Sequence, residues 1–349
     1  MSLTEKPMET PERLAFYDKI DTQCFTPLWA VLSNIITPEP KSACVPNLWK
    51  FDLAKEWLLE AGGLITAKEA ERRVLILENP GLRGQSKVTT SLYAGLQLVM
   101  PGEVAPAHRH SQSALRFVMD GAGAHTSVNG ERTLMQFGDF VITPPQAWHD
   151  HGNDTKEPMI WLDGLDIPIV SFFDASFAEG LGADEQEITR QTGDSWARYG
   201  ANMLPVDFEK NRLASPIFNY PYARSREALY QMQRQQEWDP CHGIKMRYIN
   251  PVDGSFAMPT IAPFLQLLPE GFKTAPYRST DATVFVVTEG TGRSLIDGQV
   301  FEWGPKDIFV APSWKWITHE AQGEAVMFSY SDRVAQQKLG LWREQRGLA

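Results

Sequence analysis

The sequence has few cysteines and no long apolar run. Cys24, Cys44 and Cys241 are far apart and form no CxxC pair, so they predict reduced thiols rather than a disulfide framework or a thiolate zinc site. No stretch approaches the roughly 18 to 20 apolar residues that a membrane span needs. The first residues are polar and lack the apolar core of a signal peptide, which favours a cytoplasmic protein without a membrane partner.

Clustered positive charge is also missing. The chain carries 33 Lys and Arg against 43 Asp and Glu, a formal net charge of -10, and it has no run of five basic residues. Because binding to phosphates needs clustered Lys and Arg, this balance excludes nucleic acid as the main partner. With 349 residues, the chain fits two domains of ordinary size or one internal duplication.

The pattern of residues changes from helical to strand-rich along the chain. Residues 1–70 predict a helical segment, in which 48–59 has the spacing of an amphipathic helix that ends at the glycines 62–63. From about Val74, short apolar runs alternate with turn signals, among them the hairpin pair Asn129-Gly130. Many short strands at such spacing predict a sandwich or a barrel.

The strand-rich block occurs twice. LQLVMPGE at 96–103 corresponds to LQLLPEGF at 265–272, and GDFVITPP at 138–145 corresponds to KDIFVAPS at 306–313. These pairs indicate an internal duplication with a period of roughly 170 residues. The sequence therefore predicts a mainly β fold of two antiparallel β-barrels.

The duplication suggests boundaries for four regions. After the helical residues 1–70, we predict a first barrel over 71–175, a linker with helices over 176–255, and a second barrel over 256–349. The linker contains the polar helical stretch 225–238. A short C-terminal helix is predicted to start at a Ser331 cap and to carry Val334, Leu341 and Trp342.

The histidines are few, and four of the seven form two pairs with i, i+2 spacing. Residues at i and i+2 of a strand face the same side, so His108 with His110 and His149 with His151 point together. The remaining three have no partner at ligand spacing and are interpreted as structural or surface residues; they are His125, His242 and His319.

The surroundings of these pairs resemble the two cupin motifs, G-x5-H-x-H-x3-E-x6-G and G-x5-P-x-G-x2-H-x3-N. Two positions depart from the motifs: Ala114 replaces the usual Glu, and Gln146 replaces a Gly. The resulting set of metal ligands is His108, His110 and His149. Three neutral imidazoles leave a divalent metal its full charge, which favours chelation of an anionic substrate.

The alternation of side chains along strands predicts which residues line the pocket. Arg116 shares its parity with His110 and should face inward, where it would bind a substrate carboxylate or form an internal ion pair. Tyr93, Gly95 and Gln97 share one strand face and could wall the pocket, or they could fill an ordinary core.

Two further polar side chains have inward parity. His151 could bond a substrate oxygen or transfer a proton, and Asp163 could orient His151 or accept a bond from a distal hydroxyl. For both residues, a supporting structural role is the alternative.

The segments HRHSQSALRF at 108–117 and LYAGLQL at 92–98 make the chain similar to the gentisate 1,2-dioxygenase family, which is grouped with salicylate and 1-hydroxy-2-naphthoate dioxygenases. The resemblance implies a bicupin fold, one Fe(II) per chain, dioxygen, a small aromatic hydroxy acid and a cytoplasmic homotetramer. It also implies that Arg72 or Arg73, preferably Arg72, reaches the substrate carboxylate.

The second block lacks the metal ligands of the first. Aligning it from Gly271 and Pro312 places Tyr277, Ser279 and Ile317 where the first block has imidazoles, so we expect a metal-free second barrel. Alternatives to the gentisate enzyme are a salicylate or hydroxynaphthoate dioxygenase and a cupin isomerase or hydrolase with another metal. A non-catalytic metal- or sugar-binding bicupin is the alternative of another class.

Overall fold

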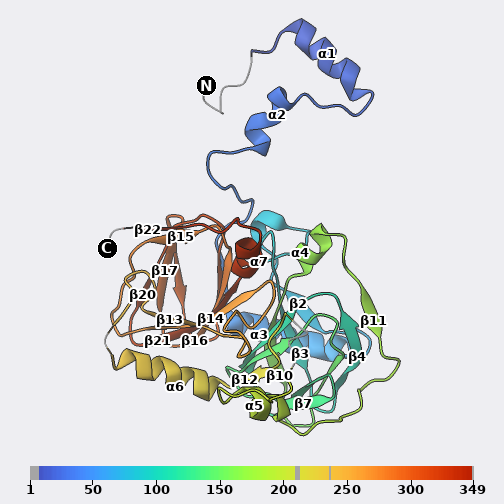
Figure 1. Ribbon diagram of the computed structural model, residues 1–349, viewed down its shortest axis with the longest axis vertical. Coiled ribbons are helices and arrows are strands. Elements are labelled where there is room, and N and C mark those ends of the chain that lie inside the picture. The colour runs from blue at the N-terminus through green and yellow to red at the C-terminus, as the bar shows by residue number, and fades with distance from the viewer. Residues whose placement is uncertain (1–7, 209–212, 236, 348–349) are drawn as a thin grey trace. The chain divides into compact units, whose positions relative to one another are not determined.

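The structure, a computed structural model, describes residues 8–208, 213–235 and 237–347 of the chain. The chain divides into two compact units, Met1–Ser42 and Ala43–Ala349. The first unit contains the helices α1 (Pro11–Asp21) and α2 (Leu28–Ile35). The second unit contains both barrels. In Figure 1, most strands of the first barrel are cyan to green, and most strands of the second barrel are orange to red.

The first barrel consists of two antiparallel sheets that face each other. One has the strand order β12-β8-β5-β10-β3-β2 and the other the order β11-β4-β9-β6-β7. Their bounds are β2 Val74–Ile76, β3 Tyr93–Val99, β4 Val104–His110, β5 Ala114–Asp120, β6 His125–Val128, β7 Glu131–Leu134, β8 Phe140–Thr143, β9 His149–Gly152, β10 Met159–Leu165, β11 Ala178–Gly180 and β12 Asn219–Tyr220.

The second barrel repeats this arrangement with the strand orders β1-β19-β16-β21-β14-β13 and β18-β17-β20-β15-β22. Its strands are β1 Asn47–Trp49, β13 Ile244–Arg247, β14 Ala262–Leu268, β15 Tyr277–Ser279, β16 Thr283–Glu289, β17 Gly292–Ile296, β18 Gln299–Trp303, β19 Ile308–Ala311, β20 Ile317–Ala321, β21 Ala325–Ser331 and β22 Glu344–Arg346. The predicted mainly β fold with two antiparallel barrels is confirmed.

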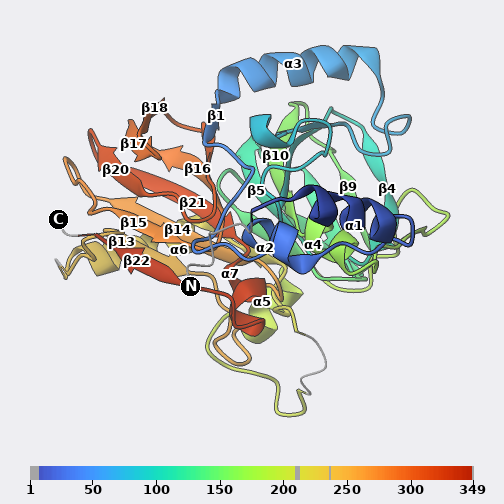
Figure 2. The ribbon, with the colours of Figure 1, turned by 90° about the horizontal axis from the view of Figure 1, so that it is seen from above.

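Helices connect and flank the barrels. They are α3 Phe51–Leu64, η1 Pro80–Leu82, α4 Ile167–Phe172, α5 Asp194–Tyr199, α6 Tyr222–Gln233 and α7 Arg333–Lys338. Figure 2 shows α3 lying along the first barrel. Within the described ranges, no helix combines the length and the apolar composition that crossing a bilayer requires.

Three helix predictions need correction at their ends. The helix predicted for 225–238 is α6, which starts after Pro221 and ends at Gln233, before Trp238. The C-terminal helix has Asp332 rather than Ser331 at its cap position and ends at Lys338, so Leu341 and Trp342 lie beyond it. Both errors arise because apolar spacing locates a helix better than it locates its ends.

The third correction concerns the helix predicted for 48–59. Leu48 belongs to β1, which pairs with β19 of the second barrel, and the helix starts only at Phe51. Asp307 fixes this junction, because its side chain accepts hydrogen bonds from Lys50 Nζ at 2.7 Å and from the backbone N of Phe51 at 3.1 Å. The helix then continues through the two glycines to Leu64. Pairing with β19, which is distant in the sequence, therefore places Leu48 in a strand although the local spacing of apolar residues predicts a helix.

The larger sheets of the two barrels share one apolar core. On β3, Leu96 and Leu98 point into this core, while the alternate residues Gly95 and Gln97 face the interior of the first barrel. At the centre of the contact, the rings of Phe117 and Phe328 stack with centroids 4.2 Å apart. One face of the sheet therefore joins the barrels, and the other face is left for the site.

We predict that Phe328→Ala lowers the free energy of unfolding by about 3 to 5 kcal/mol, because it removes a fully buried ring and leaves a cavity between the barrels. The midpoint of urea unfolding measures the effect. Phe172→Ala is the control, because the Phe172 side chain is 81% exposed and should matter little. Equal midpoints for the two variants would contradict the shared core.

Candidate metal centre

Two paired strands bring the three predicted ligands together. β4 carries His108 and His110, β9 carries His149, and His108 lies directly opposite His149 in the antiparallel register. The His108 and His149 rings have centroids 4.2 Å apart, and those of His110 and His149 are 4.8 Å apart. One ring nitrogen from each histidine lies within 4.8 Å of the other two. This arrangement can hold one metal ion on three imidazoles.

An irregularity in β4 makes this geometry possible. Ala105 pairs with His151 and His108 pairs with His149, so three steps along β4 match two steps along β9. The extra residue is a β-bulge, which reverses the parity of the strand beyond it. The bulge contains Pro106, whose missing N–H would otherwise cost a ladder hydrogen bond.

The hydrogen bonds of His110 and His149 fit a metal-ligand role. Nδ1 of His110 donates to the carbonyl of Gln112 at 3.0 Å, and Nδ1 of His149 donates to the carbonyl of Ala147 at 2.9 Å. These bonds place the lone pair on Nε2, and Nε2 of His149 is buried without a hydrogen-bond partner among the described residues. The site residues therefore fit a divalent metal.

The protonation of the triad points the same way. Burial, followed by the charge of Arg72, lowers the pKa of His108 to about 3. Burial and then Arg116 lower the pKa of His110 to about 4, and burial lowers the pKa of His149 well below its usual value. All three imidazoles are neutral at neutral pH, as ligation requires.

His151 faces the same interior and is fully buried. Its Nε2 accepts a hydrogen bond from Nη2 of Arg116 at 2.9 Å, which puts the ring proton on Nδ1. Nδ1 then donates to Oγ1 of Thr126 at 2.9 Å. The orientation of His151 thus comes from Arg116 and Thr126, and Asp163, which was one predicted partner, makes no hydrogen bond to it.

Arg116 lies at the centre of a buried polar network. Nη1 donates to Oγ1 of Thr143 at 2.6 Å, and Nε lies 3.6 Å from Oδ1 of Asp163, its direct neighbour on β10. Nε itself has no hydrogen-bond partner among the described residues. Asp163 also accepts from Nε1 of Trp161 at 3.1 Å, and burial raises its pKa to about 6. Arg116 thus lies beside an internal acid, Asp163, and still has a donor, Nε, without a hydrogen-bond partner among the described residues.

The predicted pocket wall on β3 is tightly packed around Gly95. A side chain on Gly95 would come within 2.8 Å of the Tyr93 hydroxyl and 2.4 Å of Val74 Cγ1, so these two groups fill the space that Gly95 leaves. Burial raises the pKa of Tyr93, which keeps its phenol protonated. Gln97 is buried two residues further along the same face.

The two neighbouring arginines are placed differently. Arg72 donates from Nη2 to the carbonyl of Pro106 at 2.9 Å, and the same nitrogen contacts Nδ1 of His108. Burial and then the charge of Arg116 lower its pKa to about 10. Arg73 instead forms an ion pair with Glu103 and donates to the carbonyl of Ile65 at 2.8 Å. Of the pair, Arg72 reaches the triad.

The chain is similar to several proteins over nearly its whole length. Gentisate 1,2 dioxygenase 1 of Aquipseudomonas alcaligenes is 68% identical over 346 residues, 99% of this chain and 100% of that protein. The 5-aminosalicylate 1,2-dioxygenase of Comamonas sp. is 34% identical, with 95% of this chain and 89% of that protein covered. The cupin domain model matches residues 95–165. The chain belongs to the gentisate 1,2-dioxygenase family.

A solved structure of this family supports the assignment. Salicylate 1,2-dioxygenase from Pseudoaminobacter salicylatoxidans, crystallised as an adduct with gentisate, has a TM-score of 0.91 to this chain at 34% identity. The match covers 99% of this chain and 97% of that one. The family and the bicupin fold predicted from the motifs are both confirmed.

The second barrel of this family member has the same register as the first but different side chains. Tyr277 on β15 pairs with Ile317 on β20, as His108 pairs with His149. The Tyr277 hydroxyl donates to Glu344 at 2.9 Å, and it accepts a bond from Arg333. In the described part of the chain, close groups of three ligating side chains occur only in the first barrel.

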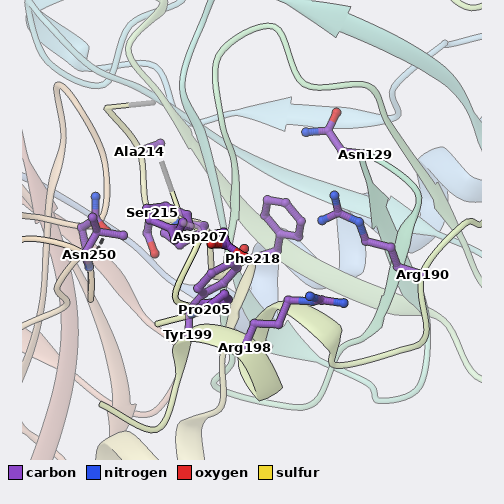
Figure 3. A pocket seen from close by; sticks show the side chains of 13 residues that line it. Asn129, Arg190, Arg198, Tyr199, Pro205, Asp207, Ala214, Ser215, Phe218 and Asn250 are labelled. Carbon is purple, nitrogen blue, oxygen red and sulfur yellow. Dashed lines mark hydrogen bonds between the residues drawn. The ribbon is translucent and has the colours of Figure 1, made fainter. Parts of the chain in front are cut away.

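One hollow lies away from the triad. Its volume is about 480 Å³, and it is lined by residues such as Arg190, Arg198, Tyr199 and Phe218, but by none of the triad histidines (Figure 3). Its size alone does not make it the active site, since it lacks the clustered imidazoles.

Sequence reasoning missed three residues that support the site: Thr126, Thr143 and Trp161. Strand parity offers a signal for two of them, because Thr126 lies opposite His151 and Trp161 is two residues from Asp163. Nothing in the spacing identifies Thr143 as a partner of Arg116.

We predict that His108→Ala, His110→Ala and His149→Ala each lose tightly held iron and turnover, since two imidazoles hold a divalent ion weakly. Protein loaded anaerobically with Fe(II) and desalted should retain one iron per chain, and each variant should retain almost none. His242→Ala, in the second barrel, is the control and should keep its iron.

Two outcomes would contradict this assignment. One is a triad variant that keeps both near-normal iron and near-normal activity. The other is a second iron per chain that disappears in His319→Ala, which would place a metal site in the second barrel.

Proposed function

We propose that this protein is a gentisate 1,2-dioxygenase. It would cleave gentisate between the carboxyl-bearing carbon and the adjacent hydroxyl-bearing carbon, and both atoms of O2 would enter the product, maleylpyruvate. The observation that carries the proposal is the neutral three-histidine cluster with buried Arg116 and Asp163 beside it, in a chain 68% identical to a gentisate 1,2-dioxygenase.

His108, His110 and His149 would hold Fe(II), one ion per chain. Bound iron would supply electron transfer from the hydroxylated ring to dioxygen. Because the triad adds no negative charge, the site keeps an excess of positive charge for an anionic substrate.

Two arginines would bind the carboxylate of the substrate. Arg116 is 3% exposed, its guanidinium is oriented by Thr143 and His151, and its Nε is a donor without a partner among the described residues. Arg72 lies beside His108 at the edge of the cluster. A planar guanidinium and a carboxylate form strong charge-assisted bonds, which would fix the ring before it reacts.

Asp163 and His151 would handle protons, and Tyr93 would contact the ring. With its pKa near 6, Asp163 can accept a proton from a substrate hydroxyl close to neutral pH. His151 offers the Nε2 lone pair that it shares with Arg116, and the Tyr93 phenol stays protonated and can donate. Gly95 and Gln97 complete this wall of the pocket.

Salicylate is the second candidate substrate, because the solved salicylate 1,2-dioxygenase has the same fold over nearly the whole chain. 1-Hydroxy-2-naphthoate is a third, since a dioxygenase for it is 32% identical over 88% of this chain. As for the setting of the reaction, we propose a cytoplasmic homotetramer that binds neither nucleic acid nor membranes.

We predict that gentisate is turned over with a higher kcat/KM than salicylate or 1-hydroxy-2-naphthoate. The second hydroxyl makes the ring easier to oxidise, and Asp163 and Tyr93 offer it polar partners that would otherwise stay unpaired. Oxygen uptake by iron-loaded protein with the three acids measures the order. An equal or higher value for salicylate would reverse the choice of substrate, and no uptake with any acid would reject the dioxygenase.

We predict that Arg116→Ala weakens binding of the aromatic acid roughly tenfold to a hundredfold while iron stays bound, because a desolvated charge-assisted pair is worth about 1.5 to 3 kcal/mol. Steady-state KM together with iron content tests this. Arg83→Ala is the control, because the Arg83 side chain is 74% exposed. If Arg116 serves only as the ion-pair partner of Asp163, KM will not change.

A further inference from the structure

A second group of ligating side chains lies on the outer face of the first barrel. His125 on β6, Asp150 on β9 and Glu185, in the segment after β11, each place one ligand atom within 4.8 Å of the other two. Asp150 alternates with His149 and His151, so it points away from the triad. The group is therefore separate from the metal centre described above, although it shares strand β9 with it.

Three polar atoms in and beside this group are buried and lack hydrogen-bond partners. His125 Nε2, Asp150 Oδ1 and Ser127 Oγ make no hydrogen bond to any described residue, and these side chains belong to residues that are at most 1% exposed. Ser127 lies directly opposite Asp150 in the register of β6 and β9, two residues from His125 on the same face. Buried polar atoms nearly always have a partner, and where the protein offers none, a water or an ion takes that place.

The charge of the group favours a cation. Asp150 and Glu185 bring two carboxylates, and Asp154 adds a third, 3.6 Å from Nδ1 of His125. In the described part of the chain, Arg132 is the one Lys or Arg that is ion-paired with any of the three. Burial lowers the pKa of His125, so its imidazole is neutral and can act as a ligand. Two negative charges remain uncompensated beside a neutral nitrogen ligand.

The group is held in place independently of any ion. Gln186 donates from its backbone N to Oδ2 of Asp150 at 2.9 Å, and its side chain bonds the backbone of Gly130 at 2.7 Å and of Ser127 at 3.0 Å. These bonds fix Glu185, its neighbour, over β6 and β9. Gly152 makes room for His125, because a side chain there would come within 2.4 Å of the imidazole Cε1.

We propose that His125, Asp150 and Glu185 bind a divalent cation, Zn²⁺ or Mn²⁺, with water completing its coordination. His125 Nε2 and Glu185 Oε1 are 3.6 Å apart, close to the roughly 3.4 Å between two ligands of a tetrahedral ion with bonds of about 2.1 Å. Oε1 also accepts from Arg132 at 2.7 Å, and a carboxylate oxygen has a second lone pair for the ion. Imidazole with carboxylates suits these two metals.

Such an ion would fasten the segment around Glu185 to the back of β9, the strand whose other face carries His149. We expect it to stabilise the first barrel without taking part in the reaction, since it contacts the outer face only.

The test is a titration of iron-loaded, full-length protein with Mn²⁺ or Zn²⁺ under anaerobic conditions, with both metals counted after desalting. The proposal expects one additional ion per chain while the iron content stays constant. It also expects that Asp150→Asn and Glu185→Gln each weaken binding of that ion at least about tenfold, as loss of a ligand should. The added ion should raise the Tm of the wild type and leave that of Glu185→Gln unchanged.

Glu187→Gln is the matched control, because Glu187 is exposed two residues further along the same segment and is not one of the grouped side chains. It should bind the additional ion like the wild type. If Asp150→Asn does not fold, Glu185→Gln decides, since its side chain is 45% exposed. Absence of an additional ion, or equal binding and an equal rise in Tm in Glu185→Gln, would overturn the proposal and leave water as the occupant.

Discussion

The pairing of β4 with β9 is the constraint on which the metal centre depends. A strand register has a period of two, so a shift by one residue would turn every side chain of β4 to the opposite face. The bulge at Pro106 makes such a shift once, and it does so between Ala105 and His108. Because of this extra residue, His108 and His110 face inward together with His149. The same bulge exposes the Pro106 carbonyl to Arg72, so one irregularity positions both ligands and a neighbouring cation.

The two faces of the larger sheet of the first barrel lie in different environments. Its outer face is apolar and packs against the second barrel, and its inner face carries Arg116 and Asp163 directly opposite each other. A charge buried on this inner face needs a partner, and the network around Arg116 supplies several. The second barrel supports the arrangement from behind: the Tyr330 hydroxyl donates to the backbone carbonyl of Tyr93 at 3.0 Å. The second barrel, in whose described residues no close group of three ligating side chains occurs, thus still helps to shape the site of the first.

The sequence was sufficient for features that depend on spacing. The two barrels, the family and the register equivalence of Tyr277 with His108 follow from turn signals, motif positions and strand parity. Features that depend on contacts between distant segments could not be predicted from the sequence. Leu48 lies in a strand because β19 pairs with it, and Arg116 is oriented by Thr143, which is on another strand. His125 and Glu185 come together because a segment sixty residues away folds over β6. In each case the structural role of the residue is set by a partner that is distant in the sequence.

The strand β1 has a consequence for how the chain is made. Lys50 and Phe51 bond Asp307 across 257 and 256 positions of sequence, and β1 completes a sheet of the second barrel whose other strands, β13 to β21, are synthesised much later. At roughly 5 to 20 residues per second, β1 waits on the order of ten to fifty seconds after its synthesis for β19. During this time its edge is unpaired and open to other chains. We expect this segment to pair last, after β19 has left the ribosome.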